Sequence, residues 1–215
     1  PNNPTGVLIE KAALEYLTKK HEQTLFVVDE SYLPFVEKAE EYSFAGDTRY
    51  KNVLVLSSMS KIFRIPGLRT GFLSADPALA EKVMAHYQPW SVNSLAQAVI
   101  EHIFDHPEQI QPFYEQTRKF TQTEKRIFCE SLDGINGMEL VDGDAYFVLA
   151  RLTGEERAPE FCRKIGQQKI LIRNCANFEG LSDEYVRFSL KDRAENTLLS
   201  KCIKSALQEG SPAHV

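Results

Sequence analysis

Hydrophobic residues recur along the chain in two patterns, and together they predict alternating helices and strands. Apolar positions at near-helical spacing predict a turn followed by a helix over 5–20. Short continuous apolar runs predict strands at 24–29, 53–56 and 71–74, the first of them buried on both faces. Strands separated by crossover segments favour a parallel α/β sheet, which binds ligands at the carboxyl ends of its strands.

The second half of the chain shows a different order, with strands grouped behind a long helix. Helices are predicted over 76–86, 94–104, 107–132, 158–166 and 194–207, and strands within 141–151 and at 170–173 and 185–190. This order predicts an α/β part over 1–106, a connecting helix over 107–133 and a small α+β domain over 134–215. The tail from Gly210 to Val215 is expected to fray.

Composition and charge narrow the class of protein. The chain has 215 residues, 43% of them apolar, and 25 basic against 30 acidic residues give a net charge of −5. These values exclude a disordered or collagen-like chain, and the mild acidity argues against a nucleic-acid partner. No apolar run approaches the roughly 18 residues that span a membrane. The four cysteines lack metal-binding spacing, which predicts reduced thiols, no metal and a cytoplasmic protein.

Lys61 lies just after the predicted strand at 53–56, at the edge of the sheet where ligands bind. By itself a lysine is usually a solvated surface residue. Here Ser58 and Ser60 precede it and Arg69 follows between glycines, a combination that suits a phosphate. The nucleotide-binding pattern G-x-x-x-x-G-K-[ST] is absent, so the phosphate would belong to another ligand, such as a phosphorylated aldehyde that bonds to the lysine.

Asp29 ends the first predicted strand and allows two interpretations. It could simply cap the turn that follows, or its carboxylate could pair with a protonated ring nitrogen, as pyridoxal phosphate chemistry requires. Tyr32, three residues later, could reach the same ligand or could be a half-buried core aromatic.

Four motifs resemble those of the fold-type I pyridoxal phosphate enzymes, the class I and II aminotransferases. They read PNNPTG at 1–6, VVDESY at 27–32, SMSK at 58–61 and GLRTG at 67–71. The resemblance implies an α/β fold with a mostly parallel central sheet flanked by helices, of which 1–106 forms the C-terminal part of the large cofactor-binding domain. Family members carry a substantial portion before the first motif, so the chain is expected to be a fragment that lacks the N-terminal part of this domain.

The resemblance also implies a role for each matching residue. Lys61, Asp29 and Tyr32 would be catalytic: Lys61 would bind pyridoxal 5'-phosphate covalently and move the proton, and Asp29 would hold the pyridine nitrogen. Asn3 and Tyr32 would hydrogen-bond the phenolic oxygen of the ring. The cofactor phosphate would be held by Ser58, Ser60 and Arg69.

Two arginines would bind the substrate in this family, together with Asn3. Arg187 matches the arginine that holds the α-carboxylate, a task that suits a bidentate guanidinium. Arg173 matches an arginine that helps bind a substrate phosphate. Without the resemblance, Arg187 would more often be a surface strand arginine, and Arg173 would be as well explained as a strand-end cation as by phosphate binding.

Residues 88–96 and 170–181 resemble the threonine-phosphate decarboxylases of cobalamin biosynthesis more closely. This implies a lyase that converts L-threonine O-3-phosphate to (R)-1-aminopropan-2-yl phosphate, working as a homodimer on a small phosphorylated amino acid. Histidinol-phosphate aminotransferases share the same framework, so an aminotransferase is the alternative. A non-catalytic pyridoxal-fold protein is the third hypothesis, since fold does not guarantee function.

Overall fold

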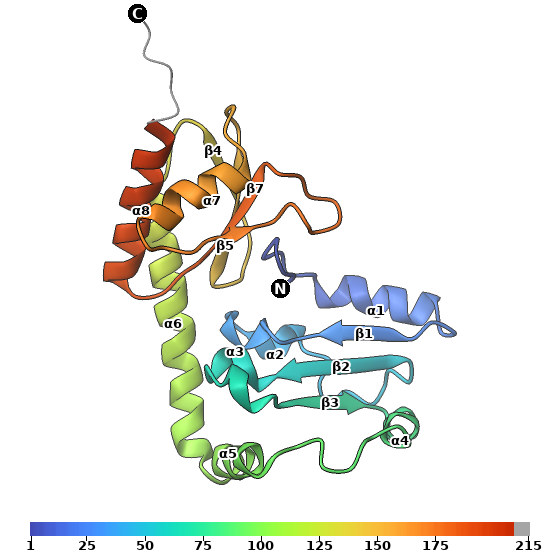
Figure 1. The fold of residues 1–215 in the computed structure, drawn as a ribbon. Coiled ribbons are helices and arrows are strands. Elements are labelled where there is room, and N and C mark those ends of the chain that lie inside the picture. The colour runs from blue at the N-terminus through green and yellow to red at the C-terminus, as the bar shows by residue number, and fades with distance from the viewer. Residues whose placement is uncertain (209–215) are drawn as a thin grey trace, which may run out of the picture. The chain divides into compact units, whose positions relative to one another are not determined.

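The computed structural model describes residues 1–208 and divides the chain into two compact units (Figure 1). Unit 1 comprises Pro1–Leu8 and the chain from Lys119 onward, and unit 2 comprises Ile9–Arg118. The division falls inside the long helix α6 (Pro107–Ser131). The tail predicted to fray, 210–215, lies outside the described residues.

Unit 2 contains a three-stranded sheet of order β1-β2-β3. In the sequence, a helix or short helical turn precedes and follows each strand. Its strands are β1 (Phe26–Asp29), β2 (Val53–Ser58) and β3 (Gly71–Ala75). Its helices are α1 (Lys11–Lys20), η1 (Leu33–Phe35), α2 (Ala39–Tyr42), α3 (Met59–Ile62), η2 (Pro66–Leu68), α4 (Pro77–Met84) and α5 (Ser94–Asp105). The predicted starts of α4 and α5 are confirmed, and the side chains of Asp76 and Asn93 accept hydrogen bonds from the first turns of these helices.

The direction of β3 differs from the sequence prediction. Strands β1 and β2 are parallel as expected, but β3 pairs with β2 in the antiparallel sense. A parallel return needs a crossover of about a dozen residues or more that carries the chain back along the sheet. The short α3 and η2 do not run back, so the chain reverses at the carboxyl end of β2.

The expectation that β1 is buried on both faces is wrong. Phe26 and Val28 pack with the buried cluster of unit 2, which contains Phe44, Tyr50, Val53 and Val55. Val27, on the opposite face, is 56% exposed. The alternating burial of β1 follows because the described part of unit 2 covers only one face at this strand.

Unit 1 is a four-stranded antiparallel sheet of order β4-β5-β7-β6 with helices packed on its core. The strands are β4 (Met138–Val141), β5 (Phe147–Leu152), β6 (Arg173–Asn174) and β7 (Tyr185–Ser189). Two helices, α7 (Ala158–Gln167) and α8 (Arg193–Gln208), share a hydrophobic core with the C-terminal turns of α6. The strand predicted at 170–173 is wrong except for its last residue, because pairing with β7 starts only at Arg173 and Leu171 is 94% exposed.

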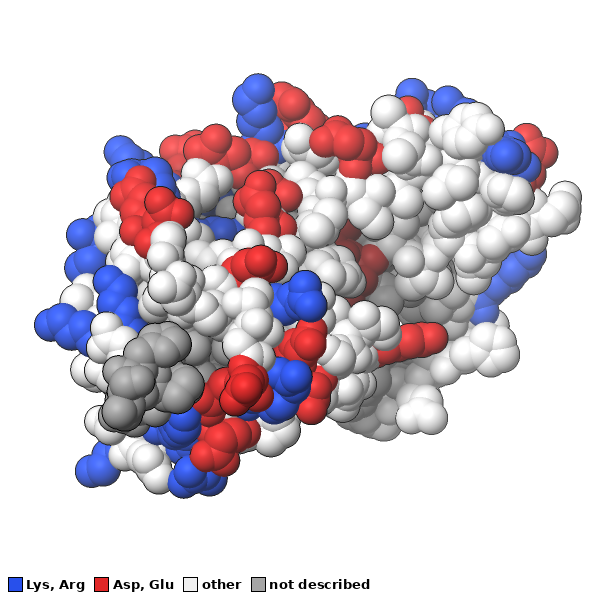
Figure 2. All heavy atoms as spheres, turned by 90° about the horizontal axis from the view of Figure 1, so that it is seen from above, with Lys and Arg blue, Asp and Glu red and all other residues white. Residues whose placement is uncertain are grey.

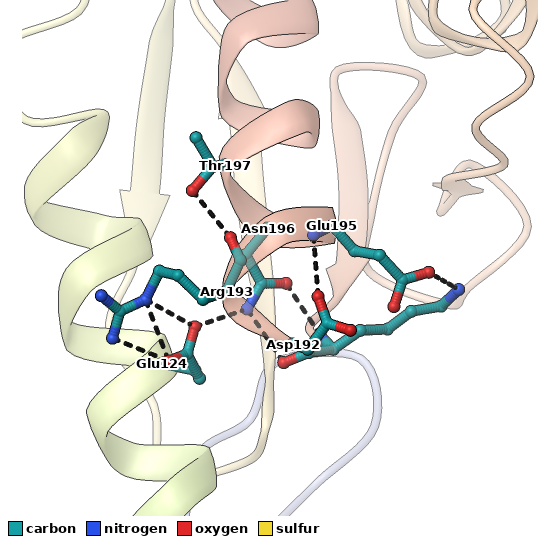
Figure 3. Close-up of polar contacts among 7 residues, drawn as sticks. Glu124, Asp192, Arg193, Glu195, Asn196 and Thr197 are labelled. Carbon is teal, nitrogen blue, oxygen red and sulfur yellow. Dashed lines mark hydrogen bonds and ion pairs between the residues drawn. The ribbon is translucent and has the colours of Figure 1, made fainter.

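A buried carboxylate joins α6 to α8 within unit 1 (Figure 3). Glu124 is 4% exposed and accepts hydrogen bonds from Arg193 Nε at 3.0 Å, Arg193 Nη2 at 2.8 Å and Asn196 Nδ2 at 3.2 Å. The hydrogen bond from Arg193 holds the pKa of Glu124 below its usual value against the opposing effect of burial. The pair therefore stabilises the folded state while Glu124 is ionised.

Glu124→Gln is expected to lower the free energy of unfolding by about 1–3 kcal/mol at neutral pH, because a charge-assisted hydrogen-bond network is lost. The folded pKa is depressed, so this contribution is complete above the unfolded value of about 4.3 and disappears as pH falls through the folded pKa. Urea unfolding of the full-length protein at neutral and acidic pH measures the difference. Glu130→Gln is the matched control on the same helix, because Glu130 and its partner Arg126 are both exposed. Equal stability losses in the two variants would contradict the assignment.

Candidate functional site

The carboxyl ends of β1 and β2 bring the candidate residues of unit 2 together. Asp29 is the last residue of β1 and Ser58 is the last residue of β2. The two strands are parallel neighbours, and Asp29 lies opposite Leu56, two residues before Ser58. Both candidate side chains therefore lie at one edge of the sheet, as the sequence predicted.

Ser31 connects these two strand ends. Its backbone N–H donates to Asp29 Oδ1 at 2.9 Å, and its hydroxyl oxygen accepts from the backbone N–H of Ser58 at 3.2 Å. Sequence reasoning assigned Ser31 no role. The turn that Asp29 makes with it is a recognisable local signal, since an aspartate often hydrogen-bonds the backbone two residues on, but the bond to Ser58 has no such signal.

Lys61 lies in the short helix α3, which follows β2 directly. Ser58 caps this helix, accepting from the backbone N–H of Ser60 at 3.2 Å. Ser60 is buried, whereas Lys61 is exposed. The Lys61 amine lies 6.0 Å from the centroid of the Tyr32 ring, at the entry to η1, which places these two candidates beside the strand ends.

Arg69 reaches the same region through the loop that precedes β3. The carbonyl of Thr70 accepts from the backbone N–H of Met59 at 3.2 Å, so this loop is fastened to the start of α3. Gly71 allows the close approach, because a Cβ there would lie 2.6 Å from the carbonyl oxygen of Ser57. Arg69 is exposed and donates from Nη1 to the Pro66 carbonyl at 3.2 Å, which leaves its other nitrogens available for an anion.

The remaining candidates, Asn3, Arg173 and Arg187, lie in unit 1. Arg173 on β6 is directly opposite Arg187 on β7, so the two side chains share one face of the sheet. Like charges in opposing positions repel, and an anion bound between them would relieve this repulsion. Arg187 Nη1 donates to Asn3 Oδ1, and the buried Arg187 Nε has no hydrogen-bond partner among residues 1–208.

Aromatic rings and an amide hold the two guanidinium groups. Arg187 lies 4.9 Å from the ring centroid of Phe147, and Arg173 lies 5.3 Å from that of Phe178. Arg173 Nη2 also donates to Asn177 Oδ1 at 2.8 Å. The sequence analysis did not single out these supporting residues. The local spacing of Asn177 and Phe178 from Arg173 is a signal that could have found them, whereas Phe147 lies far from Arg187 in sequence, on the neighbouring strand β5.

Within residues 1–208 there is no group of three or more His, Cys, Asp and Glu side chains arranged to hold a metal ion. None of the described helices combines the length and apolar character that crossing a bilayer requires. On the face shown in Figure 2, basic and acidic side chains are intermixed.

The side chains of unit 2 match the chemistry of pyridoxal 5'-phosphate. This cofactor presents an aldehyde, a phosphate and a ring nitrogen, which call for an amine, anion-binding donors and a carboxylate. Lys61, Ser58 with Arg69, and Asp29 are of these kinds, and they come from the ends of two paired strands and the loops that follow them. The donor set therefore fits the cofactor that the sequence implied.

Comparison with known proteins agrees with this fit. The family model described as aminotransferase class I and II matches residues 1–203. The threonine-phosphate decarboxylase of Salmonella typhimurium is 30% identical over 99% of this chain and 57% of its own length. The solved L-threonine-O-3-phosphate decarboxylase of Porphyromonas gingivalis has a TM-score of 0.87 and 33% identity, covering 97% of this chain and 62% of that one. The solved histidinol-phosphate aminotransferase of Clostridium acetobutylicum has the same TM-score with 28% identity and the same coverage.

These matches confirm the family resemblance and the fold-type I architecture that the motifs implied. Enzymes of this family depend on pyridoxal phosphate, which confirms the cofactor class. The chain spans little more than half the length of the Salmonella relative. Relatives with lyase names and relatives with aminotransferase names occur at similar identity.

Proposed function

Because the chain belongs to the class I and II aminotransferase family, we propose that its protein decarboxylates L-threonine O-3-phosphate to (R)-1-aminopropan-2-yl phosphate, as a pyridoxal phosphate-dependent lyase of cobalamin biosynthesis. The observation that carries this proposal is the pair of opposed arginines, Arg173 and Arg187. Threonine phosphate carries both a carboxylate and a phosphate, so it offers one anionic group to each guanidinium. Relatives that bear this activity in their names support the choice.

The cofactor would be held mainly by residues at the ends of β1 and β2 and in the loops that follow them. Asp29 would keep the ring nitrogen protonated through a charge-assisted hydrogen bond, and Ser31 holds the Asp29 carboxylate in place. Tyr32 and Asn3 would donate to the phenolic oxygen. The phosphate would be held by Ser58, Ser60 and Arg69.

Bound pyridoxal phosphate supplies an electron sink that stabilises negative charge at the substrate Cα. Lys61 would hold the cofactor before the substrate arrives, and its released amine would then carry a proton to or from the reacting carbon. The exposed position of Lys61 on a short helix leaves its long side chain free to make both movements. Arg187 would seat the carboxylate through Nε and Nη2, since Nη1 already donates to Asn3.

Orientation at Cα decides between decarboxylation and transamination. Arg187 and Arg173 together determine how the substrate is seated, and therefore whether the carboxylate or the hydrogen leaves. Histidinol-phosphate aminotransferase activity is the second candidate, because that solved relative has an equal TM-score. Histidinol phosphate carries its phosphate ester at the position where an amino acid has its carboxylate, so it offers one anionic group to the arginine pair instead of two.

Carbon dioxide release from carboxyl-labelled L-threonine O-3-phosphate tests the proposal. We expect the full-length holoenzyme to release one carbon dioxide for each aminopropanyl phosphate formed, without a keto-acid acceptor. Formation of a keto acid that depends on 2-oxoglutarate, without carbon dioxide, would show an aminotransferase instead. Neither product, with cofactor bound, would favour a non-catalytic protein of the same fold.

The working state of the protein is part of the same proposal. We propose a homodimer in the cytoplasm, without nucleic-acid or membrane partners. The four cysteines are unpaired in the structure, as a reducing compartment requires, and several large apolar side chains of unit 2 are exposed, including Met84, Tyr87 and Leu95. Sedimentation of the full-length protein tests the dimer.

A further inference from the structure

Lys125 is a partly buried amine that the proposed chemistry does not use. It lies on the part of α6 that belongs to unit 1, and its Nζ donates to the carbonyl oxygens of Gly143 and Ala145, the latter at 3.0 Å. Burial lowers the pKa of this amine. A charged donor shared by two carbonyls of one loop fixes the path of that loop. The loop concerned is 142–145, between β4 and β5.

The loop 142–145 in turn binds the N-terminal segment 1–8 through hydrogen bonds and close packing, a set of contacts that we call the clasp. The backbone N–H of Asp144 donates to the Gly6 carbonyl at 2.7 Å, and Asp144 Oδ2 accepts from the backbone N–H of Leu8 at 3.3 Å. Gly143 packs so closely that a Cβ there would lie 2.8 Å from the carbonyl carbon of Gly6 and 2.9 Å from the oxygen of Thr5. These contacts explain why residues 1–8 belong to unit 1 despite their distance in sequence.

The clasped segment is a closed turn that presents Asn3. The backbone N–H of Gly6 donates to the Asn2 carbonyl at 2.7 Å, and the N–H of Asn2 donates to the Val7 carbonyl at 2.8 Å. Asn2 Nδ2 also donates to Thr5 Oγ1 at 2.9 Å. These hydrogen bonds close the turn, and Asn3 within it accepts from Arg187 Nη1.

We propose that Lys125 is a positioning residue: through the loop 142–145 it holds the Asn3 turn in register, and Asn3 thereby orients Arg187 for the substrate carboxylate. The inference rests on the carboxylate role of Arg187 in the proposed function. Nη1 of Arg187 is tied to Asn3, so the direction of its Nε and Nη2 follows the position of the turn. A small displacement of this turn changes the direction of the Arg187 guanidinium. Displacements of about 1 Å at an active site can lower the reaction rate by up to about 100-fold.

Lys125→Met tests this in the full-length holoenzyme, because it keeps an unbranched side chain only one atom shorter and removes the donor. We expect KM for L-threonine O-3-phosphate to rise by about 10-fold or more with kcat changed far less. Amide hydrogen exchange at Gly6, Leu8 and Asp144 should quicken, while the remainder of unit 1 keeps its protection. Lys119→Met, an exposed lysine of the same helix, is the control and should match the wild type in both readouts.

Gly143→Ala is a second variant that disturbs the contact between the loop 142–145 and the turn at Gly6, because its Cβ would collide with that turn. It provides the test if Lys125→Met folds poorly. It should reproduce the rise in KM and the faster exchange. Arg187→Gln distinguishes the positioning role of Lys125 from the carboxylate role of Arg187, because it removes the guanidinium directly. Wild-type KM in both clasp variants beside a raised KM in Arg187→Gln would overturn the positioning role and leave the proposed function intact. Wild-type KM in Arg187→Gln would overturn the carboxylate assignment, and the positioning role with it.

Discussion

Replacing Lys61 by alanine is expected to lower kcat by at least about 10³-fold, because the residue would both hold the cofactor and move the proton at Cα. Lys61 is exposed on a four-residue helix, so its truncation removes an amine without opening a cavity in the core. Folding should therefore be unchanged, as circular dichroism can verify. Steady-state kinetics and the cofactor absorbance of the full-length protein measure the effect.

Lys82→Ala serves as the control for this substitution. Lys82 is an exposed lysine on α4 of the same unit, and its removal changes the net charge by the same amount. It should retain wild-type turnover. Wild-type turnover in Lys61→Ala would remove Lys61 from the mechanism and return it to the class of solvated surface lysines.

The second large effect is expected at Asp29. Asp29→Asn keeps the size of the side chain and an oxygen that can accept from the backbone N–H of Ser31, but it removes the negative charge. The strand end should stay in place while the ring nitrogen loses its ionic partner, and we expect kcat to fall by about 10²–10³-fold, the size measured for other single electrostatic contacts in active sites. A shift in the absorbance of bound cofactor should accompany the loss.

Asp105→Asn, at the exposed end of α5, is the matched control for the loss of one carboxylate from unit 2. It should leave kcat unchanged. If Asp29→Asn also kept wild-type kcat and cofactor absorbance, Asp29 would be only a cap for the turn after β1, which is the structural interpretation that the sequence left open.

Local sequence signals predicted most helices and strands, because the pattern that defines each element lies within a few residues of the chain. Asp76 followed by Pro77 marked the start of α4, and the helix predicted from position 94 begins there as α5. The direction of β3 and the exposed face of β1 were not predictable in the same way. An apolar run shows that a strand is partly buried, but pairing direction and the covering of each face depend on segments elsewhere in the chain.

In the candidate site, too, the features that follow from local patterns were predictable and the contacts between residues far apart in sequence were not. The rule that parallel strands bind ligands at their carboxyl ends brought Asp29 and Ser58 to one edge, which the structure confirms. The hydrogen bond between Asn3 and Arg187 joins residues 184 positions apart, and no local pattern announces it. Lys125 is another such case, because its importance lies in two backbone carbonyls rather than in a motif. Every residue has a backbone carbonyl, so the residue types in a sequence do not show which carbonyls bind a side chain.

Lys61 is the residue to which we expect the cofactor to be attached. Borohydride reduction of the full-length holoenzyme, followed by peptide mass spectrometry, tests it most directly, because reduction makes the lysine–cofactor bond permanent. We expect a pyridoxyl label on the peptide that contains Lys61, and no label at this position in Lys61→Ala. A label on another lysine, or a protein that binds the cofactor without any reducible bond, would contradict it.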